Sequence, residues 1–232
     1  MRLVLFDVDG TLLSARGAGR RALGRALVEV YGTAGPIDTY DFHGGTDPQI
    51  VRELLAAAGL SADAVVVRED CLYARYVAHL EAEVGDGREV TLYPGVGALV
   101  ETLARTDRCL LGLLTGNIEA GARIKLEPTG LLPHFRLGAY GSDDADRTRL
   151  PAIAARRAET VAGRAFQGSD VVVIGDTPRD VGCARAFGAT AIAVATGRHS
   201  VSDLAASGAD RVFPDFSETA RVVTAILTGS FA

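Results

Sequence analysis

Two aspartates separated by one residue stand near the start of the chain, in the stretch LVLFDVDGTLL at residues 3–13. The four apolar residues before the first acid predict a strand that is buried on both faces, as in a parallel sheet. In extended backbone Asp7 and Asp9 share a face, and Gly10 lets the chain turn away from the strand. Two carboxylates this close need a bound cation, or one of them must hold a proton.

Two later apolar segments end in polar groups of a similar kind. The segment CLLGLL at residues 109–114 leads into Thr-Gly-Asn at 115–117, and VVVI at 171–174 leads into GDTPRD at 175–180. If all three segments are parallel strands, their carboxyl ends lie at one edge of the sheet, where open α/β sheets bind ligands. We therefore expect an acid pair, a Thr/Asn pair and a second acid pair to converge.

Phosphoryl transfer is a reaction that this set of groups could perform. A phosphate monoester repels a carboxylate nucleophile, so a metal must neutralise charge and donors must hold the non-bridging oxygens. Asp7 and Asp176 offer the hard oxygen ligands that suit Mg²⁺. Thr115 offers a hydroxyl, and the amides of Gly116 and Asn117 lie at a predicted helix N-terminus, which favours an anion.

The elements that must position these groups form a doubly wound parallel α/β sheet with an inserted all-helical domain. Residues 1–14 and 90–232 alternate strand and helix and are the predicted catalytic core, and residues 15–89 are the predicted helical cap, with three helical segments and no convincing strand. Strands are expected at 3–6, 109–114, 136–139, 171–174, 191–195 and 211–213, core helices at 98–105, 118–127, 151–162 and 217–227, and cap helices at 15–31, 48–59 and 61–84.

The sequence DVDGTLL at residues 7–13 resembles the first motif of the haloacid dehalogenase-like hydrolase superfamily. This resemblance implies a Rossmann-like core in which Mg²⁺ and two aspartates carry out phosphoryl transfer. The first aspartate of the family motif is the nucleophile and the second is the general acid/base, which are the roles that the resemblance gives to Asp7 and Asp9. The carbon–halogen-cleaving members lack the second aspartate, so Asp9 favours the phosphatase branch.

The resemblance also suggests roles for the later motifs. Residues 115–117 resemble the second motif of the family, which binds the phosphoryl group. The backbone carbonyl of Asp9 would join Asp7 and Asp176 as a metal ligand. Asp180, at the start of a predicted helix, resembles the last acid of the fourth motif, which often holds metal-bound waters rather than the metal itself.

The cation that neutralises the phosphate has two candidates. The chain has one lysine, Lys125, against twenty-three arginines, and a compact ammonium is not interchangeable with a guanidinium. In some family members the lysine lies on the helix after the second motif, as Lys125 does. In others it precedes the fourth motif, where this chain offers Arg149. We favour Lys125 and keep Arg149 as the alternative.

The predicted cap contains one segment that could contact substrate. His43-Gly-Gly-Thr-Asp47 resembles the GxTD segment of related caps, so His43 and Thr46 are candidate substrate residues. A histidine in a loop is also a common surface or capping residue, and the Thr-Asp turn could simply begin the helix at Pro48.

The composition limits the class of protein. The chain has 232 residues, a net charge of −5 and a mean hydropathy of +0.19, which fits a packed domain and argues against a nucleic-acid-binding surface. No stretch is apolar enough to cross a bilayer and no apolar leader is evident, so we expect a cytoplasmic protein without a membrane partner. Cys71, Cys109 and Cys183 are too far apart for a zinc motif, and we interpret all three as packing residues.

These observations predict a Mg²⁺-dependent phosphatase that hydrolyses a small phosphorylated metabolite through an aspartyl-phosphate intermediate. A helical cap over the strand ends would enclose a small substrate and exclude water. Phosphoglycolate, sugar phosphates and nucleotides all remain open as substrates. The alternatives are a phosphomutase of the β-phosphoglucomutase type and a non-catalytic protein that binds Mg²⁺ and phosphate.

Overall fold

The computed structural model describes residues 1–228 and contains a six-stranded parallel sheet in the order β5-β4-β1-β6-β7-β8. β1 is the central strand: its Val4 pairs with Leu111 of β4 on one side and with Val172 of β6 on the other. The order reverses between β1 and β6, and such a switch point opens a crevice at the carboxyl ends of the strands. The strands are β1 (Arg2–Phe6), β4 (Cys109–Thr115), β5 (Leu137–Tyr140), β6 (Val171–Gly175), β7 (Thr190–Val194) and β8 (Arg211–Phe213).

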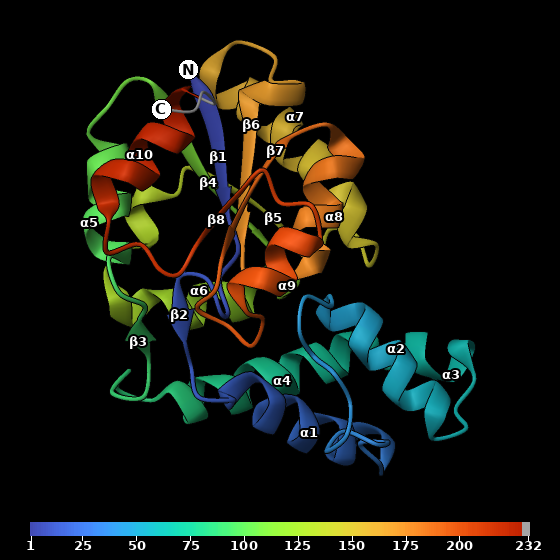
Figure 1. Cartoon of the computed structure of the whole chain (residues 1–232). Helices are drawn as coiled ribbons and strands as arrows, with labels where there is room; N and C mark the ends of the chain where they lie inside the picture. Colours follow the sequence, from blue (N-terminus) through green and yellow to red (C-terminus); the bar gives the residue numbers. More distant parts are fainter. Residues whose placement is uncertain (229–232) are drawn as a thin grey trace.

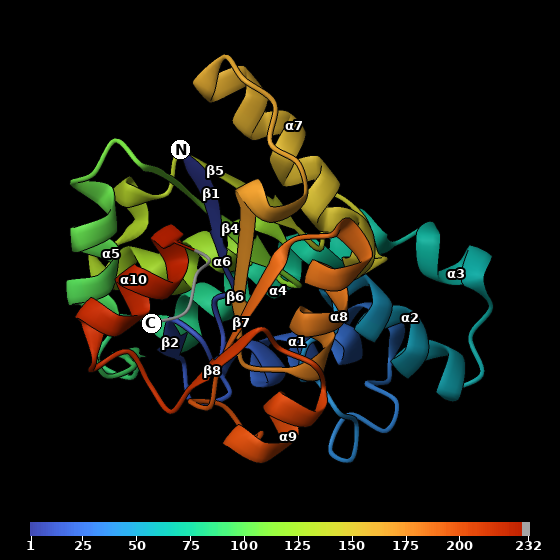
Figure 2. The same ribbon diagram turned by 45° about the horizontal axis from the view of Figure 1, so that its top comes forward.

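Helices cover both faces of the sheet (Figures 1 and 2). Side chains alternate along β1, so Val4 and Phe6 belong to the hydrophobic core on one face and Leu3 and Leu5 to the core on the other. All four are fully buried, which explains why the strand is a continuous apolar run. One face carries α5 (Val96–Ala104), α6 (Glu119–Leu126) and α10 (Thr219–Thr228); the other carries α7 (Leu150–Ala162), α8 (Pro178–Phe187) and α9 (Val201–Ala206).

Four further helices lie across the carboxyl ends of the strands (Figure 1). They lie within residues 15–89, which we call the cap segment. Three helical segments were predicted there, but the third is broken at residues 67–68 into two helices. The first begins at Ala18 rather than at residue 15, because Gly17 has a φ of 77°, outside the helical region. The four are α1 (Ala18–Tyr31), α2 (Asp47–Ala57), α3 (Ala62–Val66) and α4 (Glu69–Val84).

The two connections between the cap segment and the core run side by side. β2 (Leu13–Ser14) and β3 (Thr91–Leu92) pair in an antiparallel ribbon. Beyond the ribbon, Arg16 Nε lies 3.4 Å from Glu89 Oε2, and both side chains are exposed. Short 3₁₀ turns complete the fold at η1 (Glu127–Thr129), η2 (Leu132–His134), η3 (Arg147–Arg149) and η4 (Gly168–Asp170).

The predicted fold class is confirmed, with one helix that the sequence analysis missed and one correction. The missed helix is α9, which begins with a capping box between Ser200 and Asp203. The three cysteines are free, but only Cys183 is buried; Cys71 is exposed, so the interpretation of that residue as packing was wrong. Among residues 1–228, no helix combines the length and apolar character needed to cross a membrane.

Candidate active site

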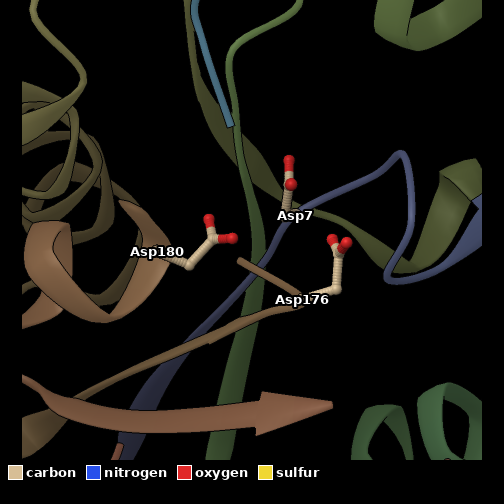
Figure 3. Close-up of side chains that lie close together, drawn as sticks. All are labelled: Asp7, Asp176 and Asp180. Atoms are coloured by element: carbon tan, nitrogen blue, oxygen red, sulfur yellow. The ribbon is translucent and has the colours of Figure 1, made fainter. Parts of the chain in front are cut away.

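Three buried carboxylates meet at the switch point of the sheet. Asp7 follows β1, Asp176 follows β6, and Asp180 lies in the first turn of α8. One oxygen from each lies within 4.8 Å of the other two, and the three side chains lie close together (Figure 3). The exposed fraction is 5% for Asp7, 1% for Asp176 and 2% for Asp180.

A tight turn after β1 brings the first motif against Asp176. The Val8 carbonyl accepts hydrogen bonds from three backbone N–H groups, those of residues 11 to 13, which curls the chain back. Gly10 has a φ of 83°, and a Cβ there would lie 2.3 Å from Asp176 Oδ2, so a side chain is excluded both by conformation and by space. The turn places Thr11 Oγ1 3.0 Å from Asp176 Oδ1, to which it donates a hydrogen bond.

Asp180 holds a buried arginine in the site. Its Oδ2 accepts from the N–H of Thr177 at 3.0 Å and from the Thr177 hydroxyl at 2.7 Å, forming the capping box of α8. Its Oδ1 accepts from Arg147 at 2.5 Å, and the same Arg147 nitrogen lies 3.3 Å from Asp7 Oδ2. Both oxygens of Asp180 therefore have protein partners, and Arg147 lies between two of the three acids.

The donor set fits a divalent cation. Three ionised carboxylates against the single guanidinium of Arg147 leave two negative charges uncompensated within the cluster. Asp7 and Asp176 would hold the ion, because Arg147 reaches only one oxygen of Asp7 and Thr11 only one of Asp176, whereas both oxygens of Asp180 have protein donors. Carboxylate oxygens are the ligands that Mg²⁺ prefers.

Burial without a cation disfavours the ionised acids. Burial raises the pKa of Asp7 to about 6, against the opposing charge of Arg147. Burial, reinforced by the charges of Asp180 and Asp7, raises the pKa of Asp176 well above its usual range. A bound cation would reverse this preference, because it favours the charged form of each carboxylate.

On the other side of Asp7, the groups of the predicted phosphate site lie together. Lys125 Nζ donates to Asp9 Oδ2 and to Asn117 Oδ1, both at 2.7 Å, although Lys125 is two turns along α6. Asn117 Nδ2 donates to Asp9 Oδ2 at 2.7 Å and to Thr115 Oγ1 at 2.8 Å. Thr115, Asn117 and Lys125 are buried, whereas the side chain of Asp9 is 45% exposed.

A cavity of about 550 Å³ lies between the core and the cap segment and joins these groups. Asp7, Asp9 and Asp176 line its core side. Three arginines line its opposite side together with His43: Arg16 and Arg20 from the cap segment and Arg198 from the core. A space of this size suits a small anionic molecule.

Comparison with known proteins agrees with this site. The family model described as haloacid dehalogenase-like hydrolase matches residues 4–194. The chain belongs to this family. It is 31% identical to a phosphoglycolate phosphatase of Rhodospirillum rubrum over 221 residues, covering 93% of this chain and 88% of that protein. It is 28% identical to a phosphoglycolate phosphatase of Synechococcus elongatus over 230 residues, covering 98% and 99%.

Solved structures support the same fold. A hydrolase from Pseudomonas syringae superposes with a TM-score of 0.73 at 21% identity, covering 98% of this chain and 100% of that one. The predicted family, fold class and enzyme class, a phosphatase-type hydrolase, are thus confirmed.

Two of the candidate residues of this haloacid dehalogenase-like hydrolase do not lie in the cavity. Arg149 is 69% exposed and lies near Asp144 and Asp146, outside the cavity. Thr46 is fully buried: its hydroxyl donates to the Ala145 carbonyl and accepts the N–H of Gln49, which makes it the N-cap of α2. His43 does line the cavity, with Nδ1 2.7 Å from Asp41 Oδ1.

Three residues that line the cavity were not predicted as site residues from the sequence. Arg147 was not proposed for any role, and Arg20 was treated as part of a cap helix. Asp47 was interpreted as a helix cap, but it is the first residue of α2, and its Oδ2 accepts the N–H of Ile118 at 2.9 Å. Burial raises the pKa of Asp47 to about 6, although Lys125 and the hydrogen bond from Ile118 oppose the shift.

These pKa shifts predict how pH and Mg²⁺ affect the stability of the hydrolase. Because Asp7 and Asp47 hold protons more tightly in the folded than in the unfolded chain, the free energy of unfolding falls as pH rises from about 4 through 6, and the raised pKa of Asp176 acts in the same direction. We expect the metal-free protein to melt about 5 °C or more lower at pH 7.5 than at pH 5. Mg²⁺ should raise the melting temperature more at pH 7.5 than at pH 5, because the ion then has fewer protons to displace from the carboxylates.

Differential scanning calorimetry at the two pH values, with EDTA or with Mg²⁺, measures both effects. Asp143 illustrates an acid that does not contribute between pH 5 and 7.5. Burial would raise its pKa, but the hydrogen bond from Arg157 lowers it below its usual value. The variant Asp176→Asn is the control and should abolish the Mg²⁺-dependent increase. An equal Mg²⁺ effect at both pH values would contradict the assignment.

Proposed function

We propose that this hydrolase is a Mg²⁺-dependent phosphatase that cleaves a small phosphorylated metabolite through an aspartyl phosphate on Asp7. The observation that carries the proposal is the position of Asp7 after the central strand β1: Thr115 ends β4 on one side, Asp176 follows β6 on the other, and all three line one cavity together with Asn117 and Lys125. A carboxylate in this position can accept a phosphoryl group whose charge is neutralised from both sides.

The first half of the reaction transfers the phosphoryl group to the protein. An Asp7 oxygen attacks phosphorus, a new P–O bond forms, and the bond between phosphorus and the leaving oxygen breaks. Mg²⁺, held by Asp7 and Asp176 and, from the family resemblance, by the backbone carbonyl of Asp9, would supply the charge neutralisation that this attack requires. Lys125 and the amides of Gly116 and Asn117 bind the non-bridging oxygens.

Asp9 handles the proton in both halves. It donates a proton to the leaving alkoxide, and it then takes one from the water that attacks the aspartyl phosphate and releases inorganic phosphate. In the structure Asp9 Oδ2 accepts hydrogen bonds from Lys125 and Asn117. When a phosphate draws Lys125 and Asn117 toward its own oxygens, Asp9 loses these donors and can hold the proton that it must deliver.

The cap side of the cavity favours a substrate with a second negative group. The guanidinium of Arg20 donates to the carbonyls of Asp38 and Tyr40, at 3.3 and 2.8 Å, and lies 4.4 Å from the centre of the Phe42 ring. Among residues 1–228 no carboxylate forms an ion pair with it. A guanidinium held in this way can form a charge-assisted hydrogen bond with the carboxylate of phosphoglycolate, the compound after which several relatives are named.

Steady-state assays on two substrates test this function. Phosphoglycolate should be hydrolysed only with Mg²⁺, and faster than ethyl phosphate, which has no carboxylate. Arg20→Met should lower kcat/KM for phosphoglycolate about 10- to 100-fold and for ethyl phosphate less than about threefold, because a charge-assisted hydrogen bond is lost in one case only.

Arg16→Met is the matched control for the Arg20 experiment. Arg16 also lines the cavity, but its guanidinium already lies near Glu89, so both substrates should keep their rates. Absence of Mg²⁺-dependent phosphate release from every ester tested would contradict the proposal. Slow hydrolysis that a bisphosphate accelerates would indicate a phosphomutase instead.

A further inference from the structure

The cap segment forms hydrogen bonds with the proposed phosphate-binding loop, residues 115–118. The N–H of Asp47, at the start of α2, donates to the Gly116 carbonyl at 2.7 Å. The carboxylate of the same residue accepts the N–H of Ile118 at 2.9 Å. One residue therefore contacts the loop on both sides of Asn117.

The backbones at this contact are too close for side chains. A Cβ on Gly116 would lie 1.9 Å from the Gly45 carbonyl oxygen, and a Cβ on Gly141 would lie 2.1 Å from the Gly116 carbonyl oxygen. The Thr46 hydroxyl donates to the Ala145 carbonyl at 2.7 Å in the same contact. The backbone of residues 45–46 in the cap segment, the backbone of residue 116 and the loop after β5 are thus in direct contact.

Helix α6 depends on this contact for its N-terminus. Its N-cap residue is Ile118, whose apolar side chain cannot accept a hydrogen bond, and no side chain caps the helix from that position. The N–H of Ile118 is bonded by Asp47, and the next N–H, of Glu119, by the Ser142 hydroxyl at 3.1 Å. Asp47 is 8% exposed, so its hydrogen bonds are sheltered from water.

We infer that Asp47 is a positioning residue for phosphoryl transfer: its carboxylate and N–H set the loop of Thr115, Gly116 and Asn117 against Asp7 when the cap covers the cavity. If the cap segment moves away, Ile118 N–H and the Gly116 carbonyl lose these partners. The loop is then complete only when the cavity is closed to water, which ties phosphate binding to closure. This inference rests on the proposed function for its kinetic part only.

Two substitutions separate the hydrogen bond from the charge. Asp47→Ala removes the acceptor and should lower kcat on phosphoglycolate about 10- to 100-fold, with a smaller change in KM. Asp47→Asn keeps an acceptor oxygen of the same shape without the charge, and should keep kcat within about threefold of wild type. Asp63→Ala is the control, because Asp63 is an exposed acid in the first turn of the neighbouring helix α3, and should change nothing.

Hydrogen–deuterium exchange provides a readout that does not depend on turnover. With inorganic phosphate as the probe, residues 115–118 should gain protection in wild type and in Asp47→Asn, and should stay about tenfold less protected in Asp47→Ala. Equal kcat and equal protection in Asp47→Ala and wild type would overturn the inference, as would an Asn variant as impaired as the Ala variant. If no variant hydrolyses any ester, the proposed function fails, and the exchange experiment still decides the role of Asp47.

Discussion

Replacing Asp7 by asparagine is expected to abolish phosphate release, lowering kcat by at least about 10⁴-fold. The amide is close in shape to the carboxylate but is not a nucleophile at phosphorus, and it is a poorer ligand for a divalent cation. Both functions proposed for Asp7 are therefore lost together. Release of inorganic phosphate from phosphoglycolate, followed at saturating Mg²⁺, measures the effect.

The same variant should fold at least as well as wild type in the absence of metal. Burial raises the pKa of Asp7 to about 6, so the ionised carboxylate is unfavourable in the folded chain at pH 7.5, and the neutral amide removes that penalty while losing the contact with Arg147. An unchanged or higher melting temperature would show that the loss of turnover is not a loss of structure. Undiminished turnover would rule out Asp7 as the nucleophile.

A second measurement locates the phosphoryl group itself. Wild-type protein quenched in acid during turnover should carry one phosphoryl group on the peptide that contains Asp7, detected by mass spectrometry, and Asp7→Asn should carry none. Phosphate trapped on any other residue would contradict the proposed intermediate even if the variant were inactive.

Much of the core was predictable because its signals are local. Each central strand is an apolar run followed by polar residues, and burial on both faces of a parallel sheet requires that pattern in β1, β4 and β6. The rule that parallel strands end at one edge then brings Asp7, Thr115 and Asp176 together without any knowledge of side-chain contacts. The prediction that Lys125 reaches the site also agrees with its position.

The contacts between the cap segment and the core were not predictable in the same way. Asp47 stands where many acids simply begin a helix, and its hydrogen bond to Ile118 joins residues 71 positions apart. Nothing local in the sequence distinguishes an acid that caps its own helix from one that reaches another. Arg20 likewise follows the helical pattern of α1, and its place in the cavity depends on how the cap lies over the sheet.

Arg147 was not among the predicted site residues, although Arg149, two residues later, was the alternative to Lys125. Arg147 and Arg149 lie in the 3₁₀ turn η3, where positions two apart point to different sides. The signal that could have decided between them is the apolar spacing of α7, in which Leu150, Ala154 and Ala158 are buried. Continued back by three residues from Leu150, that buried face reaches Arg147 and not Arg149.

Replacing Arg147 by alanine is therefore expected to cost far more than the same change at Arg149. Arg147 is 7% exposed and lies between Asp7 and Asp180, so its loss leaves two buried carboxylates without their cation. Their protonation then becomes more favourable, and a protonated Asp7 cannot attack phosphorus. We expect kcat/KM to fall about 10²- to 10³-fold and the melting temperature to fall as well, since breaking a buried ion pair costs about 3–5 kcal/mol.

Arg149→Ala is the matched control, two residues away in the same turn. Its guanidinium is 69% exposed beside Asp144 and Asp146, and exposed pairs of this kind contribute about 0–1 kcal/mol, so turnover and melting temperature should stay near wild type. Arg147→Lys keeps the charge but not the planar fork, and should recover part of the loss. Because protonation of Asp7 is the proposed cause, the acid limb of the pH–rate profile of Arg147→Ala should shift to higher pH. An unshifted limb with reduced turnover would mean that Arg147 acts on the substrate rather than through Asp7.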